Sequence, residues 1–499
     1  MAETKREIER KYASDEGGLP DLTGVAGVAA VLDKGLVELD ATYYDTADER
    51  LARSSVTLRR RTGGSDAGWH LKLPIAPHVR DEIRAPLSDT VPDELAALVR
   101  SRTRGAPLVP VVRLRSSRDV RHLVDAAGTL LAEASVDEVH AERLNRAGGT
   151  ARWTEIEVEL ADGGDPAFLA RVDKQLRKAG VKPSASPSKL ARAFQETGGV
   201  GARTPVPAKP VTAGDHLLAY LRTQRDAIVE CDPAVRRDLP DAVHRMRVAT
   251  RRMRSTFRTF GAVLDRAVTD PVAAELKWLA GELGADRDQE VLAERLTAAL
   301  GDLPPGLVHG PVRERLTSWA GARHSHTRGH LVAVLDSTRT LALFDTLDAL
   351  LADPPLRKKA AKKPEAVLGA AVRKDFARVS RLVAAALDLP PGRDRDGALH
   401  EARKKAKRTR YAAEAAAPAL GGPARSLAAS MKSLTGLLGD HQDSVMARDT
   451  LRELSVVAHA AGEDAFTYGL LYGREEARAA AAERELPRLW KRIEGGVDL

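Results

Sequence analysis

Residues 6–12 read REIERKY, and within this stretch Glu7, Glu9 and Lys11 occupy every second position. In a β-strand, side chains two residues apart point to the same face of the sheet. The stretch therefore predicts a strand that carries two carboxylates and one ammonium group on a single face.

Residues 155–160, EIEVEL, repeat this alternation of acids with aliphatic side chains. The stretches between these two acidic strands carry bases at the same two-residue spacing. A face that gathers clustered acids and clustered bases indicates more than solubility, because carboxylates suit divalent metals and bases suit phosphates. The basic positions are Arg59 and Arg61 in TLRRR, His70 and Lys72 in WHLKL, and Arg80 and Arg84, with Glu82 between them, in RDEIR.

Composition gives a weaker indication of the partner. Lys and Arg number 78 against 70 Asp and Glu, a net charge of +8 over 499 residues, so polyanions are plausible partners but the bias is mild. The single cysteine, Cys231, excludes an intrachain disulfide and fits a reducing compartment. Since no apolar run approaches ~18 residues and the first residues lack a secretory signal, we expect a cytoplasmic protein that does not span a membrane.

The chain changes character near residue 200. Residues 1–200 alternate strand-like runs with turns and two helical patterns, which predicts an α+β domain built on an antiparallel sheet. Residues 201–214, rich in proline and glycine, are predicted to be a linker. Residues 215–499 carry apolar side chains at helical spacing and are predicted to be all α.

The predicted helical domain contains an internal duplication. HRMRVATRRMR at 244–254 matches HEARKKAKRTR at 400–410, and each is followed by a Leu-Gly segment with aspartates about 40 residues after the histidine. These aspartates are Asp286 and Asp288 in the first copy and Asp440 and Asp443 in the second. A basic, proline-containing stretch at 352–366 separates repeat halves of about 215–350 and 367–495.

Each copy places its bases on one side of a helix. Offsets of 0, 3, 7 and 10 residues fall within a sector of about 80°, so like charges lie one turn apart and repel. A bound anion would relieve this repulsion; pairing with acids such as Asp286 and Asp440 is the alternative. We call the two sets the first stripe, His244, Arg247, Arg251 and Arg254, and the second stripe, His400, Arg403, Lys407 and Arg410.

The doubled HxxR helix with its downstream Leu-Gly segment resembles the CHAD domain over residues 215 to about 495. The resemblance implies two helical bundles related by internal symmetry, which bind inorganic polyphosphate through a basic central channel. Both stripes would line that channel. Glu401 stands where the first copy has Arg245, which implies weaker binding by the second stripe.

The first 200 residues resemble the CYTH domain, the triphosphate tunnel metalloenzyme fold. Glu7, Glu9 and Lys11 match its E-x-E-x-K signature in full. The resemblance implies an eight-stranded antiparallel barrel with a charged interior, open at both ends. Further matching features, in order, are YYDT at 43–46, LRRR at 58–61, LKLP at 71–74, RDEI at 80–83, Arg118, Asp137-Glu138, EIEVE at 155–159 and SKL at 188–190.

This resemblance also implies roles for the charged residues. Lys189 would close one mouth of the tunnel. The expected triphosphate-binding residues are Lys11, Arg59, Arg61, Lys72, Arg80 and Arg118. The expected ligands of Mg²⁺ or Mn²⁺ are Glu7, Glu9, Glu155 and Glu157, with Asp137 as a further candidate.

The resulting prediction is an enzyme that hydrolyses inorganic triphosphate or a related triphosphate with a divalent metal, joined to a polyphosphate-binding module. Adenylate cyclase and thiamine triphosphatase activity remain alternatives. The low aromatic content, 4% of residues, weighs against nucleoside recognition, because a base needs an aromatic surface on which to stack. A non-catalytic protein that decorates polyphosphate granules is a second alternative. Nucleic-acid binding through the basic helices is a third and less expected one. The substrate, the preferred metal, the coupling of the domains and the oligomeric state are not fixed by the sequence.

Overall fold

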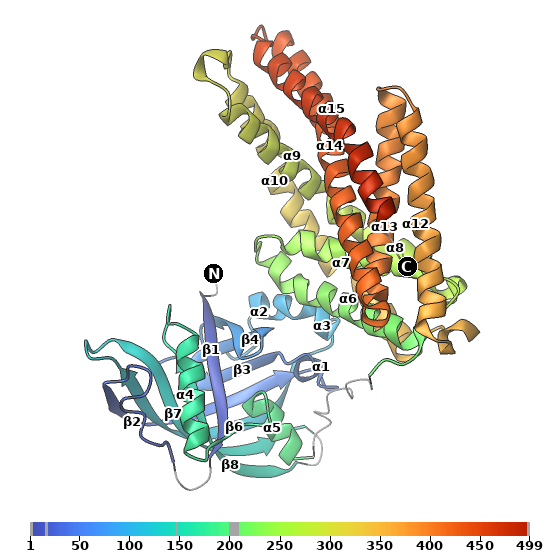
Figure 1. Ribbon diagram of the computed structural model, residues 1–499. Coiled ribbons are helices and arrows are strands. Elements are labelled where there is room, and N and C mark those ends of the chain that lie inside the picture. Colours follow the sequence, from blue (N-terminus) through green and yellow to red (C-terminus); the bar gives the residue numbers. More distant parts are fainter. Residues whose placement is uncertain (1–2, 15–17, 146–147, 199–208, 497–499) are drawn as a thin grey trace. The chain divides into compact units, whose positions relative to one another are not determined.

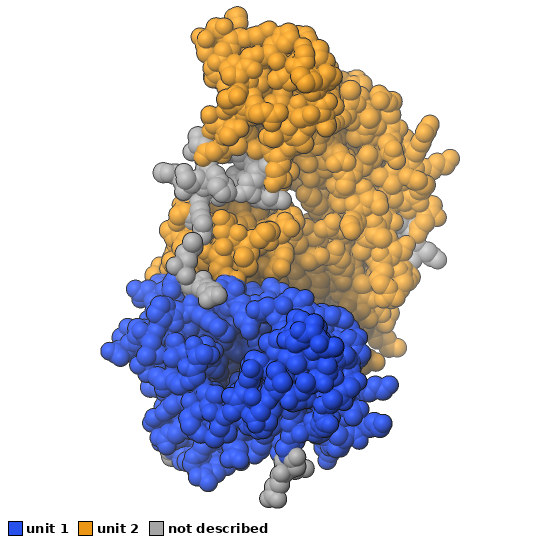
Figure 2. All heavy atoms as spheres, turned by 90° about the vertical axis from the view of Figure 1, so that its left-hand side faces the viewer, with its two compact units in different colours: residues 1–206 blue, residues 207–499 orange. Residues whose placement is uncertain are grey.

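The computed structural model describes residues 3–14, 18–145, 148–198 and 209–496, without the side chains of 285–290 and 322–328. The chain divides into two compact units, residues 1–206 and 207–499 (Figure 2). Most of the predicted linker, 201–208, lies outside the described residues. Within the described parts of the chain, no helix combines the length and the apolarity that crossing a membrane requires.

Unit 1 (1–206) is an antiparallel β-barrel, as the sequence predicts (Figure 1). Neighbouring strands follow the order β5-β4-β3-β2-β6-β7-β8-β1, and pairing of β1 with β5 closes the ring. A two-residue strand, β9 (Lys182–Pro183), adds to β1. The barrel strands are β1 (Glu3–Ser14), β2 (Ala30–Asp45), β3 (Thr57–Thr62), β4 (Gly68–Ala76), β5 (Val79–Ala85), β6 (Val109–Val124), β7 (Leu130–Arg143) and β8 (Thr150–Leu160).

The pairing register assigns the charged side chains to the barrel interior. Residues paired directly across two strands point to the same side of the sheet. Following the ring from β5 through β1 to β6, the pairs on one face are Glu7 with Arg80, Lys11 with Glu157, Glu155 with Asp137, and Asp137 with Arg118; Lys72 pairs with Glu82 on the neighbouring strands.

The opposite, outer face of the barrel is apolar and is covered by helices. Tyr12, Ile156 and Val158 are buried beneath α4 (Ala167–Lys178), which contributes Phe168 and Val172. Helix α2 (Asp93–Leu98) covers β3, β4 and β5 in the same way, and α5 (Lys189–Glu196) packs against β7 and β8. This barrel therefore reverses the usual arrangement, with apolar side chains outside and charges inside. The remaining short helices are α1 (Arg50–Arg53) and α3 (Arg100–Thr103).

Unit 2 (207–499) is all α, as predicted (Figure 1). Its first helix begins at Ala213, inside the range 201–214 predicted as linker, because Thr212 and Asp215 form a capping box. The α-helices are α6 (Ala213–Arg236), α7 (Ala242–Thr259), α8 (Arg266–Glu282), α9 (Gly284–Gly301), α10 (Val312–Asp336), α11 (Thr338–Ala352), α12 (Pro364–Asp388), α13 (Arg393–Leu420), α14 (Gly422–Ala460) and α15 (Phe466–Gly495); the 3₁₀ turns are η1 (Pro305–Leu307) and η2 (Lys358–Ala361).

The internal duplication is visible as a repeated contact. In the first copy, a Cβ placed on Gly284 would lie 2.8 Å from the Arg247 guanidinium, and in the second a Cβ on Gly439 would lie 3.1 Å from that of Arg403. Both glycines therefore leave room for the arginine of their own stripe. The copies differ in that a break separates α8 from α9 next to Gly284, whereas α14 runs unbroken through Gly439.

Candidate functional site

The barrel encloses a cavity of about 640 Å³ whose lining is charged on almost every strand. The lining holds ten Lys or Arg side chains and eight Asp or Glu side chains. Because the positive and negative side chains nearly balance, the lining by itself cannot neutralise a polyanion. A polyanion is therefore expected to enter together with cations. One face of unit 1 is visibly hollowed in Figure 2.

Three buried carboxylates meet on the β7 and β8 side of the barrel. Asp137, Glu155 and Glu157 each offer an oxygen, and these atoms lie within 4.8 Å of one another. The first residue of α5, Lys189, reaches all three, with its Nζ 2.9 Å from Asp137, 3.0 Å from Glu155 and 2.5 Å from Glu157. An all-oxygen set of carboxylates is what Mg²⁺ and Mn²⁺ prefer.

Two further cations hold this acidic group in place. Lys11 forms ion pairs with Glu157 and, at 3.0 Å, with Glu9. Arg118 donates to Asp137 and to Glu157, each at 2.7 Å. Burial disfavours the charged carboxylate of Glu157, but Lys11, Lys189 and Arg118 outweigh it and hold the pKa of Glu157 well below its usual range. The carboxylate is therefore ionised at neutral pH.

Glu7 lies in a second group of charges. Its Oε1 accepts a 2.5 Å bond from the Nζ of Lys72, which also lies 3.6 Å from Glu82. Its Oε2 is buried and accepts no hydrogen bond from the residues that the structure describes. Of the five carboxylates predicted as metal ligands, three thus form one compact group, Glu9 is joined to it through Lys11, and Glu7 pairs with Lys72.

The basic side of the cavity carries guanidinium nitrogens that make no hydrogen bond with the described residues. The Nε atoms of Arg59 and Arg61 are buried and donate to none of the described residues. Burial and the nearby Arg59 and Arg118 lower the pKa of Arg61, although its guanidinium also forms an ion pair with Asp66. Arg80 also lines the cavity and donates to the carbonyl of Pro187 at 2.8 Å.

Among the carboxylates that line the cavity but were not predicted site residues, Glu82 is the buried one. Glu82 is 3% exposed; its Oε1 lies 2.9 Å from His70 Nδ1 and 3.8 Å from Arg59, and its Oε2 is 2.6 Å from Arg84. Burial opposes its ionisation, but His70, Lys72 and Arg59 hold the pKa of Glu82 far below its usual range. The signal was present in the sequence, because Glu82 shares the two-residue spacing of Arg80 and Arg84.

In unit 2 the two stripes lie on α7 and α13, which pack against each other. The pKa of Lys407 is lowered to about 8 by burial and by the positive charges of Arg403 and Arg251. Arg251 belongs to the first stripe and Lys407 to the second, so charges of the two stripes repel each other. Burial, Arg258 and Arg251 likewise lower the pKa of Arg254. The two stripes therefore form one concentration of positive charge.

Several donors of this basic region have no partner among the described residues. The buried Nε atoms of Arg251, Arg254 and Arg403 make no hydrogen bond there. His400 uses its Nδ1 in a 2.7 Å bond with Gln442, and Arg410 lies 3.4 Å from Glu414. Of the two acids named above as alternative partners, Asp286 has its side chain outside the described residues, and Asp440 is exposed. Buried donors of this kind can donate hydrogen bonds to the oxygen atoms of a ligand.

Comparison with known proteins gives the class of each unit. The CYTH domain family matches residues 5–194, and the CHAD domain family matches residues 219–452. Two uncharacterized proteins, from two strains of Mycobacterium tuberculosis, are each 38% identical to this chain over 513 aligned residues, which cover 98% of this chain and 97% of theirs. The chain therefore belongs to the family in which a CYTH domain is followed by a CHAD domain.

Solved structures resemble the two units separately. PptA from Streptomyces chartreusis is 24% identical, with a TM-score of 0.48, and covers 57% of this chain and 100% of its own. The CHAD domain of the plant Ricinus communis is 22% identical, with a TM-score of 0.44, over 59% of this chain and 97% of its own. A putative adenylyl cyclase from Hippeastrum, described as having a dominant triphosphatase activity, is 16% identical, with a TM-score of 0.23, over 38% of this chain and 95% of its own.

Proposed function

We propose that unit 1 hydrolyses a phosphoanhydride bond of inorganic triphosphate, or of a related triphosphate, and that it needs a divalent metal. The observation that carries the proposal is one cavity of about 640 Å³ whose lining includes Glu157, a member of the compact carboxylate group, together with Arg59 and Arg61, whose buried Nε atoms donate to none of the described residues. A chain of phosphates held by the bases would reach the carboxylates across this cavity.

The metal would be held by Asp137, Glu155 and Glu157, with Glu9 close by through Lys11. The all-oxygen donor set of this group fits Mg²⁺ or Mn²⁺. In the neighbouring group of charges, the buried Oε2 of Glu7 accepts no hydrogen bond from the described residues. When bound, such an ion neutralises phosphate oxygens and polarises the phosphoryl group that is attacked. Lys189 occupies the centre of the carboxylate group and must move aside or share its oxygens when the ion enters.

The residues of the chain would supply positioning and charge. Arg59 and Arg61 can each direct a free Nε–H at phosphate oxygens, and Lys72 and Arg80 add cations on the neighbouring strands. Hydrolysis of a phosphoanhydride requires mainly positioning and neutralisation of charge, because the transition state spreads negative charge over the phosphoryl oxygens. A carboxylate of the acidic group could orient the attacking water.

For unit 2 we propose binding of inorganic polyphosphate along both stripes. The lowered pKa values of Lys407 and Arg254 and the unused donors of Arg251 and Arg403 support it, because a polyanion would supply both the missing charge and the missing acceptors. Such binding would hold long phosphate chains in the same molecule as a domain that takes short ones.

A phosphate-release screen tests the enzymatic proposal. Purified protein is supplied with triphosphate, pyrophosphate, ATP, thiamine triphosphate and long polyphosphate, each with Mg²⁺, with Mn²⁺ and with chelator. We expect metal-dependent release to be fastest from inorganic triphosphate. Preference for thiamine triphosphate, or formation of cyclic AMP from ATP, would instead assign one of the alternative activities, and no release from any substrate would favour a granule-binding protein.

Competition tests the proposal for unit 2. Labelled polyphosphate is bound to the full chain and challenged with unlabelled polyphosphate, duplex DNA or RNA at matched phosphate concentration and at fixed salt, since salt weakens every such complex. We expect only polyphosphate to compete well. Equal displacement by DNA or RNA would contradict the assignment.

A further inference from the structure

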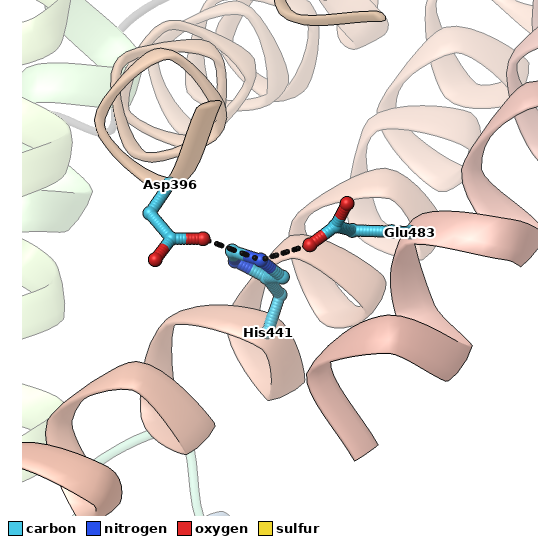
Figure 3. A group of neighbouring side chains, drawn as sticks. All are labelled: Asp396, His441 and Glu483. Atoms are coloured by element: carbon cyan, nitrogen blue, oxygen red, sulfur yellow. Dashed lines mark hydrogen bonds and ion pairs between the residues drawn. The ribbon is translucent and has the colours of Figure 1, made fainter. Parts of the chain in front are cut away.

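A second group of metal-ligating side chains lies in the helical unit and takes no part in the functions proposed above. Asp396 on α13, His441 on α14 and Glu483 on α15 each present one ligand atom, and these atoms lie within 4.8 Å of one another (Figure 3). His441 is 1% exposed, and its Nε2 points between the two carboxylates. Three different helices thus contribute one ligand atom each.

The distances in this group match those between ligands of a single ion. His441 Nε2 lies 3.2 Å from Asp396 Oδ1 and 3.3 Å from Glu483 Oε1. Charge-assisted hydrogen bonds are shorter, about 2.7–2.9 Å. Two ligands each ~2.0–2.1 Å from a tetrahedral ion are about 3.3 Å apart. Both distances from the imidazole are therefore those expected between two ligands of one ion, and all three atoms lie within 4.8 Å of one another.

Each carboxylate is also oriented by an arginine through its other oxygen. Asp396 Oδ2 lies 3.4 Å from Arg448, and Glu483 Oε2 lies 3.1 Å from the Nε of Arg395. The inner oxygens are left to face His441. Outer contacts of this kind fix the ligands of protein metal sites and keep their carboxylates ionised.

We propose that Asp396, His441 and Glu483 bind a transition-metal ion of the Zn²⁺ class. One imidazole nitrogen and two carboxylate oxygens suit Zn²⁺ better than Mg²⁺, which prefers oxygen ligands alone, and a water would complete the tetrahedron. The ion would join α13, α14 and α15 in the second repeat half. This site is separate from the carboxylate group of the barrel and does not depend on the proposed activity.

The site would be specific to the second copy. Measured from the stripe histidine, the position of Asp396 corresponds to Pro240, and measured from the Leu-Gly pair, the position of His441 corresponds to Asp286. The repeat fold therefore does not itself require this group of residues. Asp396 lies one turn before His400 on α13, and Gln442, next to His441, is hydrogen-bonded to His400. An ion here would add positive charge at the end of the second stripe.

The test measures Zn²⁺ binding to the untagged full-length protein, with Mg²⁺ in excess to occupy the oxygen ligands of the barrel. Competition with a chromophoric chelator gives stoichiometry and affinity for the wild type, for His441→Gln and for Asp396→Asn. We expect each variant to lose one tightly bound equivalent of Zn²⁺, and Zn²⁺ to raise the Tm of the wild type but not of either variant. The matched control is His309→Gln, which removes an exposed histidine paired with a single carboxylate, Asp464, and should keep the full stoichiometry.

Equal Zn²⁺ stoichiometry in the wild type and in both variants would overturn the proposal and leave His441 as a bridge between two carboxylates. If a variant fails to fold, the proposal is tested instead on the wild type, by recording its visible absorption with bound Co²⁺ in the presence of excess Mg²⁺. A four-coordinate site of nitrogen and oxygen ligands gives a visible ligand-field absorption that Zn²⁺ abolishes. Absence of that absorption would equally contradict the site.

Discussion

At the scale of single residues, neighbours in the sequence have opposite environments in the barrel. Asp137 is fully buried among Lys189, Arg118 and Glu157, whereas Glu138 is exposed on the outer face of the same strand. Burial opposes the charge of Asp137, but Lys189 and Arg118 lower its pKa below the usual range. Because consecutive residues of a strand point to opposite faces, Asp137 and Glu138 form a matched pair for mutagenesis, one inside the barrel and one outside.

We expect Asp137→Asn to reduce metal-dependent phosphate release by about 100-fold, because one of three proposed metal ligands loses its charge. Glu138→Gln, the control one residue away, should keep wild-type activity. Initial rates are measured over a range of Mg²⁺ and Mn²⁺ concentrations, with circular dichroism to verify folding. Equal rates for Asp137→Asn and the wild type would remove Asp137 from the site.

The second residue-scale prediction concerns Lys407, whose pKa is lowered to about 8. Bound phosphate would favour the charged ammonium, so binding above pH 8 requires uptake of a proton and becomes weaker. We expect the affinity for polyphosphate to fall by about tenfold between pH 7 and pH 9, a change set by this one titration. Lys407→Arg should largely remove the pH dependence.

The control for this experiment is Lys404→Arg, which alters an exposed lysine on the same helix and should keep the wild-type pH profile. Affinity is measured by isothermal titration at constant ionic strength. A flat wild-type profile between pH 7 and pH 9 would contradict the coupling of Lys407 protonation to polyphosphate binding.

At the scale of elements, α14 positions the second stripe through a single glycine. The absence of a side chain at Gly439 lets the Arg403 guanidinium lie against the helix, and Gly284 does the same for Arg247 in the first copy. Three residues before Gly439 on the same helix, Gly436 has open space where a Cβ would be. The two glycines of α14 therefore differ only in what a side chain would meet.

We expect Gly439→Val to displace the Arg403 guanidinium and to weaken polyphosphate binding several-fold. Gly436→Val makes the same change in helix propensity without that clash, so it should bind as the wild type does. Binding isotherms of the two variants are compared, together with triphosphate hydrolysis, which both should retain. Identical weakening by the two substitutions would point to the helix and not to Arg403.

At the scale of the whole molecule, each unit has its own hydrophobic core. The clusters around β1, β4 and β6 contain only residues of unit 1, and the helical clusters contain only residues of unit 2. Each core is therefore built without apolar residues from the other unit, and each unit has the size of an ordinary domain.

We accordingly expect fragments 1–206 and 207–499 to fold separately. The first should hydrolyse triphosphate with a kcat/KM within about twofold of the full chain, and the second should bind polyphosphate. Thermal unfolding, phosphate release and binding are measured for each fragment and for an equimolar mixture. Loss of cooperative unfolding in either fragment would mean that the units depend on each other for stability.

The sequence by itself determined an antiparallel sheet with a charged face and the helical duplication, and the resemblance to the CYTH family implied that the sheet closes into a barrel. The sequence could do so because the two-residue period of Glu7, Glu9 and Lys11 assigns a face to each side chain, and the repeated stripes assign a face to α7 and α13. It placed Glu82 on the charged face with Arg80 and Arg84 but gave this carboxylate no role, whereas the structure buries it among His70, Lys72 and Arg84.

Only the tertiary structure decided which charges become neighbours. Strand spacing assigns a carboxylate to the inner face, but closure of β1 on β5 and the docking of α5 bring Lys189 to Asp137, Glu155 and Glu157 and leave Glu7 with Lys72. The group of Asp396, His441 and Glu483 depends on the packing of three helices whose ligands lie more than 40 residues apart. Such contacts are set by long-range packing, which local periodicity does not encode.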